Sequence, residues 1–200
     1  MISKLNLGFF ASHGGSNMQA IFDACKSGKL DAKPCVVISN NSNSFALKRA
    51  QMEGIPFYHI SHAKFPDELE FENVIINILE EHKVDTIVLA GYMKKLGDRI
   101  IEHFHGRVLN IHPALLPKFG GEGMYGEKVH QAVLKSEEKV TGVTIHLVNT
   151  KYDNGRILAQ REVPVLNGDT SDTLSKRVLE LEHILYPETL QKVAEGTILL

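Results

Sequence analysis

The sequence contains no tryptophan, only two cysteines and no long run of apolar residues. Cys25 and Cys35 do not have the close spacing that is typical of metal ligands, and isolated thiols fit a reducing compartment. No segment approaches the ~18 apolar residues that a membrane-spanning helix needs. Residues 1–5 run directly into an apolar stretch, without the long apolar region and cleavage site of a signal peptide. We therefore expect a cytoplasmic protein that does not cross a membrane.

A large charge of one sign is also lacking, since 22 basic and 24 acidic residues leave a formal net charge of −2. A nearly neutral chain gives no electrostatic reason to expect binding to nucleic acid or to an anionic membrane surface. The ten histidines include no His-x-x-Glu-His pattern, and the sequence has no Cys-x-x-Cys. Because zinc sites commonly use such spacings, we expect no metal.

The sequence does contain a regular alternation of strand-like apolar runs and amphipathic helical segments. Strands are predicted at residues 5–11, 34–39, 55–60, 85–90 and 107–111. Strands that alternate with helices predict an α/β fold, a Rossmann-like, mostly parallel twisted sheet with helices on both faces. Residues 140–148 and 156–164 flank a turn-rich segment and predict an antiparallel hairpin added at the C-terminal end.

The segment Ser12–Asn17 joins the first predicted strand to the first predicted helix and contains two adjacent glycines. A strand, a glycine turn and a helix form the opening half of a nucleotide-binding unit, in which N–H groups at the helix N-terminus face an anion. The segment lacks both the dinucleotide fingerprint and the lysine of a P-loop, so a single phosphate is a better prediction than a pyrophosphate. The alternative is a tight turn that needs glycine only for its backbone dihedral angles.

A second polar segment, Asn-Ile-His-Pro, ends the predicted strand at residues 107–111. Side chains alternate along a strand, so Asn110 and His112 project to the same side. Pro113 disfavours the helical region for the residue before it, which keeps His112 extended. A carboxamide beside an imidazole can stabilise an oxyanion and carry a proton, although a histidine that only bonds a backbone carbonyl remains an alternative.

Together these segments resemble the folate-dependent formyltransferases, and the resemblance runs along nearly the whole chain. The matching segments are Gly15–Asn17, 88–93, the Asn-Ile-His-Pro-Ala-Leu-Leu-Pro motif at 110–117, Asp153 in a loop after a Thr-Gly-Val-Thr-Ile-His strand, and Glu182-His183. The Asn-x-His-Pro motif marks the wider superfamily. The Gly-Ser-Asn turn and the chain length favour the members that act on glycinamide ribonucleotide.

The resemblance implies a single formyltransferase domain over residues 1–200, with the formyltransferase fold. It implies a phosphate-binding half of about 1–105 and a catalytic and folate-binding half of about 106–200. The implied reaction is formyl transfer from 10-formyltetrahydrofolate to the amine of glycinamide ribonucleotide, directly through a tetrahedral intermediate, in de novo purine biosynthesis. A reduced folate thus enters as co-substrate.

The resemblance also implies roles for individual residues. Asn110 would stabilise the formyl oxygen as it becomes an oxyanion, His112 would carry the proton, and Asp153 would raise the pKa of His112. The substrate residues would be Gly15, Ser16, Asn17 and Glu182 for glycinamide ribonucleotide, and Met93, Lys94, Lys95, Leu96, Asn110, Thr150, Lys151, Tyr152 and Asp153 for the folate. Without the resemblance, Glu182 would be interpreted as a solvated helix carboxylate.

The chain departs from the family pattern at three places. Glu68 falls where relatives often carry an arginine, which leaves the contacts of the folate tail open, with Lys64 or Lys94 as possible substitutes. The loop at 120–126 is longer than in the shortest members, and Asn154 replaces a common glycine.

Two other functions compete with this prediction. A formyltetrahydrofolate deformylase would use Asn110, His112 and Asp153 with water as acceptor, but such enzymes usually carry an additional N-terminal domain. A non-catalytic phosphate-binding α/β module would use only the glycine turn. The oligomeric state is left open between a monomer and a homodimer.

Overall fold

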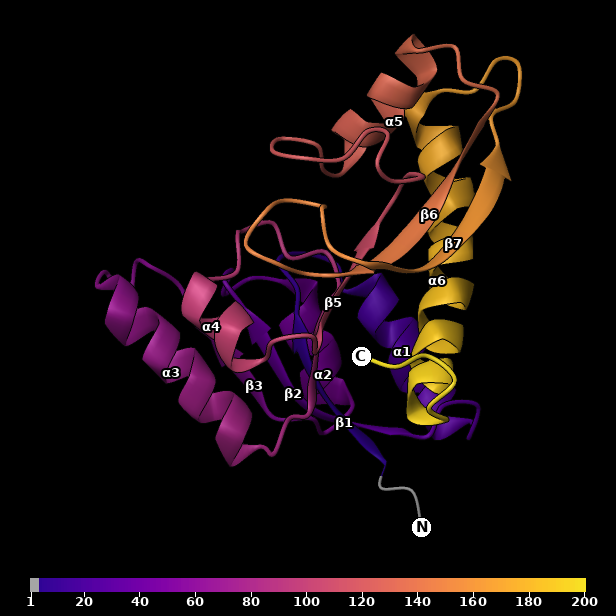
Figure 1. Cartoon of the computed structure of the whole chain (residues 1–200). Coiled ribbons are helices and arrows are strands. Elements are labelled where there is room, and N and C mark those ends of the chain that lie inside the picture. Colours follow the sequence, from indigo (N-terminus) through magenta and orange to yellow (C-terminus); the bar gives the residue numbers. More distant parts are fainter. Residues whose placement is uncertain (1–3) are drawn as a thin grey trace.

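Seven strands form one sheet in the order β3-β2-β1-β4-β5-β6-β7 (Figure 1). The computed structural model describes residues 4–200; residues 1–3, which the sequence places before the first strand, lie outside this range. The strands are β1 (Leu5–Phe10), β2 (Ala32–Ser39), β3 (Phe57–His59), β4 (Thr86–Leu89), β5 (Val108–His112), β6 (Val140–Leu147) and β7 (Ile157–Pro164). The helices are α1 (Ser16–Lys26), α2 (Phe45–Met52), α3 (Glu68–Glu81), α4 (Asp98–His103), α5 (Glu127–Lys135) and α6 (Ser171–Ala194).

The sheet is mixed in the way that the sequence predicts. Strands β1 to β5 pair in parallel, whereas β5 with β6 and β6 with β7 pair antiparallel. Strand β1 lies between β2 and β4, so the chain changes direction across the sheet after β3. Ligands of open α/β sheets bind beside such a switch point, outside the carboxyl ends of the strands.

Helices cover both faces of the sheet because successive strand residues face opposite sides. Phe9, Val37 and Val88 pack into a core that α1, α2 and α6 complete, whereas Phe10 and Ile38 pack into a second core with α3 and α4. Figure 1 shows α3 and α4 on one side of the sheet and α1 and α6 on the other. The predicted fold class is therefore confirmed.

Two elements differ from the sequence-based expectation. Strand β3 covers only Phe57–His59 of the predicted 55–60. Helix α4 was not predicted, because its N-cap Gly97 supplies no capping side chain. The cap comes from α3 instead, where the buried Glu72 accepts a hydrogen bond from the Arg99 N–H at 3.0 Å.

The turn after β5 is held by the hydroxyl of Thr144, a fully buried residue of β6. This hydroxyl donates to the Ala114 carbonyl at 2.6 Å and accepts from the Leu116 N–H at 3.0 Å. The Gln160 amide of β7 donates to the same oxygen at 2.9 Å. The segment that follows His112 is thus fixed to the two antiparallel strands.

Candidate active site

A cavity of about 710 Å³ lies outside the carboxyl ends of β4 and β5. Its walls come from the loops after β4 and β5, from the β6–β7 loop, and from α1, α5 and α6. Nearly all residues that the sequence assigns to the site line this cavity: Asn17, Met93, Lys94, Lys95, Leu96, Asn110, His112, Thr150, Lys151, Tyr152, Asp153 and Glu182. Gly15 and Ser16 do not line it, but Ser16 is the first residue of α1 and Asn17 is the second.

His112 ends β5 and is only 3% exposed. Its Nε2 lies 2.8 Å from the carbonyl oxygen of Phe119, and because a carbonyl only accepts, Nε2–H is the donor. Its Nδ1 faces Asp153, with 3.6 Å between Nδ1 and Oδ2. The predicted proximity of these two residues is therefore correct.

Asp153 raises the pKa of His112, as the resemblance implies, but the net shift of that pKa is downward. Burial lowers the pKa of His112 below its ordinary value, and this effect outweighs the Asp153 carboxylate and the Phe119 carbonyl, which both raise it. The site is so poorly solvated that the neighbouring carboxylate does not fully compensate for the cost of burying a charged imidazole. His146 adds a small effect that also lowers the pKa of His112.

Asp153 reaches the site from the loop between β6 and β7. Its backbone has φ +48°, and Phe119 has φ +57°, so both residues that flank His112 adopt the left-handed region that non-glycine residues rarely occupy. Burial raises the pKa of Asp153, but interactions with His146, His112 and the Gly121 N–H together lower it below its usual value. The Gly121 N–H donates to Oδ2 at 3.0 Å. Asp153 is therefore held as a carboxylate against the imidazole.

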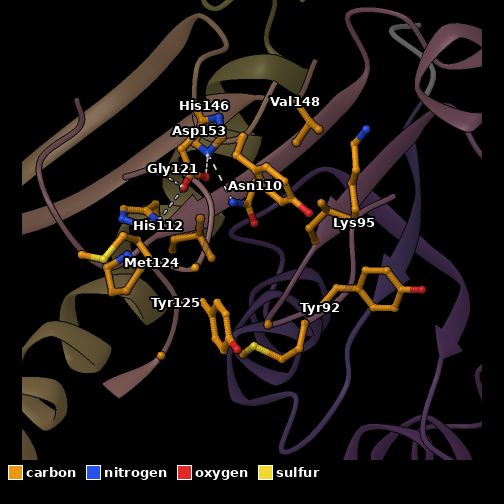
Figure 2. Close-up of a pocket in the computed structure, with 18 of the residues that line it drawn as sticks. Tyr92, Lys95, Asn110, His112, Gly121, Met124, Tyr125, His146, Val148 and Asp153 are labelled. Carbon is orange, nitrogen blue, oxygen red and sulfur yellow. Dashed lines mark hydrogen bonds and ion pairs between the residues drawn. The ribbon is translucent and has the colours of Figure 1, made fainter. Parts of the chain in front are cut away.

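Asn110 and His112 are alternate residues of β5, as the sequence predicts, and Figure 2 shows both beside Asp153 and His146. Asn110 pairs with His146 across the antiparallel ladder of β5 and β6. Its Nδ2 lies 3.2 Å from Nε2 of His146. The amide is only half-buried and lines the cavity, so it remains accessible to a ligand.

Glu182 is buried on α6 with 7% exposure, so its interpretation as a solvated carboxylate is wrong. The Asn17 amide donates a hydrogen bond to its Oε2 at 2.7 Å. Burial raises the pKa of Glu182 to about 7, although the Asn17 amide opposes this shift. The Asn17 side chain is thus engaged with Glu182, and an anion at this turn would meet backbone N–H groups instead. Gly15, the N-cap of α1, has no side chain that could cap those groups.

Ser12 connects the glycine turn to the segment Met93–Leu96. Its hydroxyl accepts a hydrogen bond from the Met93 N–H at 2.8 Å and donates to Asn40 Oδ1 at 2.6 Å. Its own N–H donates to the Gly91 carbonyl at 3.0 Å. Because Ser12 is 2% exposed, the glycine turn and the segment Met93–Leu96 are joined by a buried contact.

Several residues that line the cavity were not predicted from the sequence, among them His130, His146, Met124 and Tyr125. His146 lies in the Thr-Ile-His strand that supported the resemblance, and its pairing with Asn110 required the strand register. His130 lies on the buried face of α5, and its Nδ1 has no hydrogen-bond partner within residues 4–200. Periodicity alone could not separate such a histidine from a residue of the core.

Among residues 4–200, no three His, Cys, Asp or Glu side chains are grouped as they would be around a metal ion. No helix in this part of the chain has the length and the apolar composition to cross a membrane.

Residues 5–190 match the model of a protein family described as formyl transferase. The chain belongs to the formyl transferase family. It is 42% identical over 196 residues to "Phosphoribosylglycinamide formyltransferase, chloroplastic" of Arabidopsis thaliana, and the match covers 98% of this chain and 67% of that protein. It is 34% identical over 192 residues to "Phosphoribosylglycinamide formyltransferase" of Escherichia coli (strain K12), and the match covers 96% of this chain and 88% of that protein. The chain therefore spans about two thirds of the plant relative and most of the bacterial one.

Solved structures of formyltransferases share this fold. Glycinamide ribonucleotide transformylase 1 from Symbiobacterium toebii superposes with a TM-score of 0.93 at 36% identity, over 100% of this chain and 92% of that one. A formyltetrahydrofolate deformylase from Pseudomonas syringae pv. tomato has a TM-score of 0.87 at 25% identity, and the match covers 63% of its chain. The transformylase is thus more similar in sequence, in structure and in length.

Proposed function

We propose that this formyltransferase moves a formyl group from 10-formyltetrahydrofolate to the amine of glycinamide ribonucleotide, giving formylglycinamide ribonucleotide and tetrahydrofolate. The names of its relatives support this reaction. The observation that carries the proposal is that one cavity is lined by Asn110, His112 and Asp153 and also by the buried carboxyl group of Glu182.

The cavity fits a reduced folate in size and lining. Small-molecule sites occupy roughly 300–1,000 Å³ and combine apolar walls with a few polar groups, and a cavity of about 710 Å³ falls within this range. Leu89, Leu96 and Val148 supply apolar surface, and Lys94 and Lys95 lie beside them for an anionic tail. Thr150, Lys151, Tyr152 and Asp153 would complete the folate site from the opposite loop.

Asn110 and His112 would act on the reacting atoms. A carboxamide N–H aimed at the formyl oxygen stabilises the negative charge that develops there, and loss of one such donor typically costs about 10²–10³ in rate. His112 would take the proton from the attacking amine and return it to the leaving nitrogen, with Asp153 stabilising the imidazolium in between. No covalent bond to the protein is required, because a ternary complex would hold the amine against the formyl carbon.

Glu182 and the start of α1 would bind the acceptor. A carboxylate that is poised to ionise near pH 7 can accept a hydrogen bond from an amine and can orient its lone pair. The N–H groups at Gly15, Ser16 and Asn17 would bind the phosphate at the helix N-terminus. The phosphate and the amine of one molecule would thus be held by adjacent elements, α1 and α6.

Turnover of purified protein with 10-formyltetrahydrofolate, measured with and without glycinamide ribonucleotide, tests the proposal. We expect folate product to form only when the ribonucleotide is present, together with an equal amount of formylated ribonucleotide. Product without the ribonucleotide would instead indicate the deformylase, and binding of the ribonucleotide without turnover would indicate a non-catalytic module. The buried Asn17–Glu182 pair favours transfer over hydrolysis, because a water acceptor has no amine-bearing group for this pair to bind.

A further inference from the structure

His146 makes a contact through each of its ring nitrogens, and the contact at one nitrogen decides whether the other can accept a hydrogen bond. Its Nδ1 lies 2.9 Å from the carbonyl oxygen of Leu147, and its Nε2 lies 3.2 Å from the Asn110 amide nitrogen. Because a carbonyl oxygen only accepts, Nδ1 carries a proton. In a neutral imidazole the second nitrogen is then a bare acceptor, so Nε2 can receive an N–H from Asn110.

We propose that His146 is a positioning residue that fixes the orientation of the Asn110 carboxamide. One N–H of Asn110 donates to His146 Nε2, and the second remains for the formyl oxygen in the proposed reaction, on which this inference rests. If the carboxamide rotated by half a turn, its oxygen would face the bare nitrogen. Two acceptors would then oppose each other in a site where His146 is 2% exposed, and a buried polar group without a partner disfavours that orientation.

Asp153 offers a competing partner for His146, because its Oδ1 lies 3.5 Å from Nε2. A proton on Nε2 would serve that contact, and Asn110 would then turn its oxygen toward the ring and lose the donor role. The distances favour Asn110, because its Nδ2 lies 3.2 Å from Nε2 of His146, against 3.5 Å for Oδ1 of Asp153.

The tautomer of His146 can be measured independently of catalysis. In ¹⁵N-histidine-labelled protein at neutral pH, long-range ¹H–¹⁵N correlations distinguish a protonated from a bare ring nitrogen. The His146 signals are assigned by their loss in His146→Phe, or in His146→Gln if the first variant does not fold. We expect Nδ1 protonated and Nε2 bare; a proton on Nε2 would overturn the proposal.

Kinetics test whether His146 acts through Asn110. His146→Phe keeps a buried ring but removes the acceptor, and His146→Gln can place a carboxamide oxygen near the position of Nε2. We expect kcat of His146→Phe to fall by about 10–10²-fold, because Asn110 would no longer be oriented toward the oxyanion. Each KM should stay within about threefold of the wild-type value. His146→Gln should recover most of this loss.

A double-mutant cycle separates positioning from a general structural role. In an Asn110→Ala background, His146→Phe should change kcat by less than about threefold, because the group that His146 orients is gone. An equal loss in both backgrounds, or an equal loss in the Phe and Gln variants, would contradict the proposal. Wild-type protein without formyl transfer would refute the proposed function instead, and the tautomer measurement would still decide the His146–Asn110 contact.

Discussion

Asn17 and Glu182 lie 165 positions apart in the chain, yet the Asn17 amide donates a 2.7 Å hydrogen bond to the Glu182 carboxylate. The pair joins the second residue of α1 to the middle of α6, and both side chains line the cavity. Asn17 Oδ1 is buried and has no hydrogen-bond partner within the described residues, so the pair retains an acceptor for a bound amine or hydroxyl.

Glu182 should make the ligand-free protein less stable as the pH rises. Its pKa is about 7 in the folded protein against 4.5 for the ordinary carboxyl group, so the folded state holds a proton between these pH values that the unfolded state has lost. The free energy of unfolding should therefore fall between about pH 4.5 and pH 7, by up to about 3 kcal/mol. In Glu182→Gln this decline should disappear, as measured by denaturant unfolding at pH 5 and pH 8. Glu180→Gln, at an exposed position of α6, is the control and should keep the wild-type slope.

His112→Ala should fold and should lose about 10²–10⁴ in kcat, the usual contribution of a general acid–base group. The side chain is buried, so the check is turnover per folded protein, with the fold verified by circular dichroism. Wild-type turnover in the folded variant would exclude His112 as the proton carrier.

Asp153→Asn should lower the pKa of His112 further. The carboxylate raises that pKa against the larger effect of burial, and an amide keeps an acceptor for the Gly121 N–H but removes the charge. An NMR titration of the His112 ring should therefore move to lower pH, while kcat falls and both KM values change little. If the titration stays in place and the variant is folded, Asp153 has only a structural role in its loop.

Gly15→Val should raise the KM for glycinamide ribonucleotide more than the KM for the folate. Gly15 has φ +66°, and a Cβ atom would lie 2.9 Å from that of Ala46, so a side chain strains the turn and displaces its N–H groups. Gly14→Ala is the matched control, because a Cβ atom at that position meets nothing within 4 Å. Equal increases of both KM values would indicate a general loss of folding.

Ser12→Ala should weaken folate binding several-fold, because the Met93 N–H and the Asn40 carboxamide each lose a buried partner. Such losses cost about 1–3 kcal/mol. The KM for the folate should rise more than that for the ribonucleotide. Ser27→Ala removes an exposed hydroxyl contact after α1 and should leave both values unchanged.

The strands, their alternation with helices and the Asn110–His112 face follow from local patterns, because apolar periodicity and the restriction before Pro113 act over a few residues. The approach of Asp153 to His112 came only from the family resemblance, since 41 positions separate these residues and no local signal joins them. Helix α4 was missed because its cap, Glu72, belongs to another helix. The burial of Glu182 and the net pKa shift of His112 depend on how many elements close around each side chain. A local sequence pattern does not show how deeply these two side chains are buried in the folded chain.

The Thr144 network has a consequence for the dynamics of the cavity wall. The Leu116 N–H donates to a hydroxyl of a fully buried residue, which in turn is anchored to the Ala114 carbonyl. Hydrogen exchange at Leu116 should therefore require opening of the sheet, whereas the glycine-rich segment at 120–126 should exchange through local opening. The backbone that follows His112 should therefore exchange much more slowly than the glycine-rich segment of the same cavity.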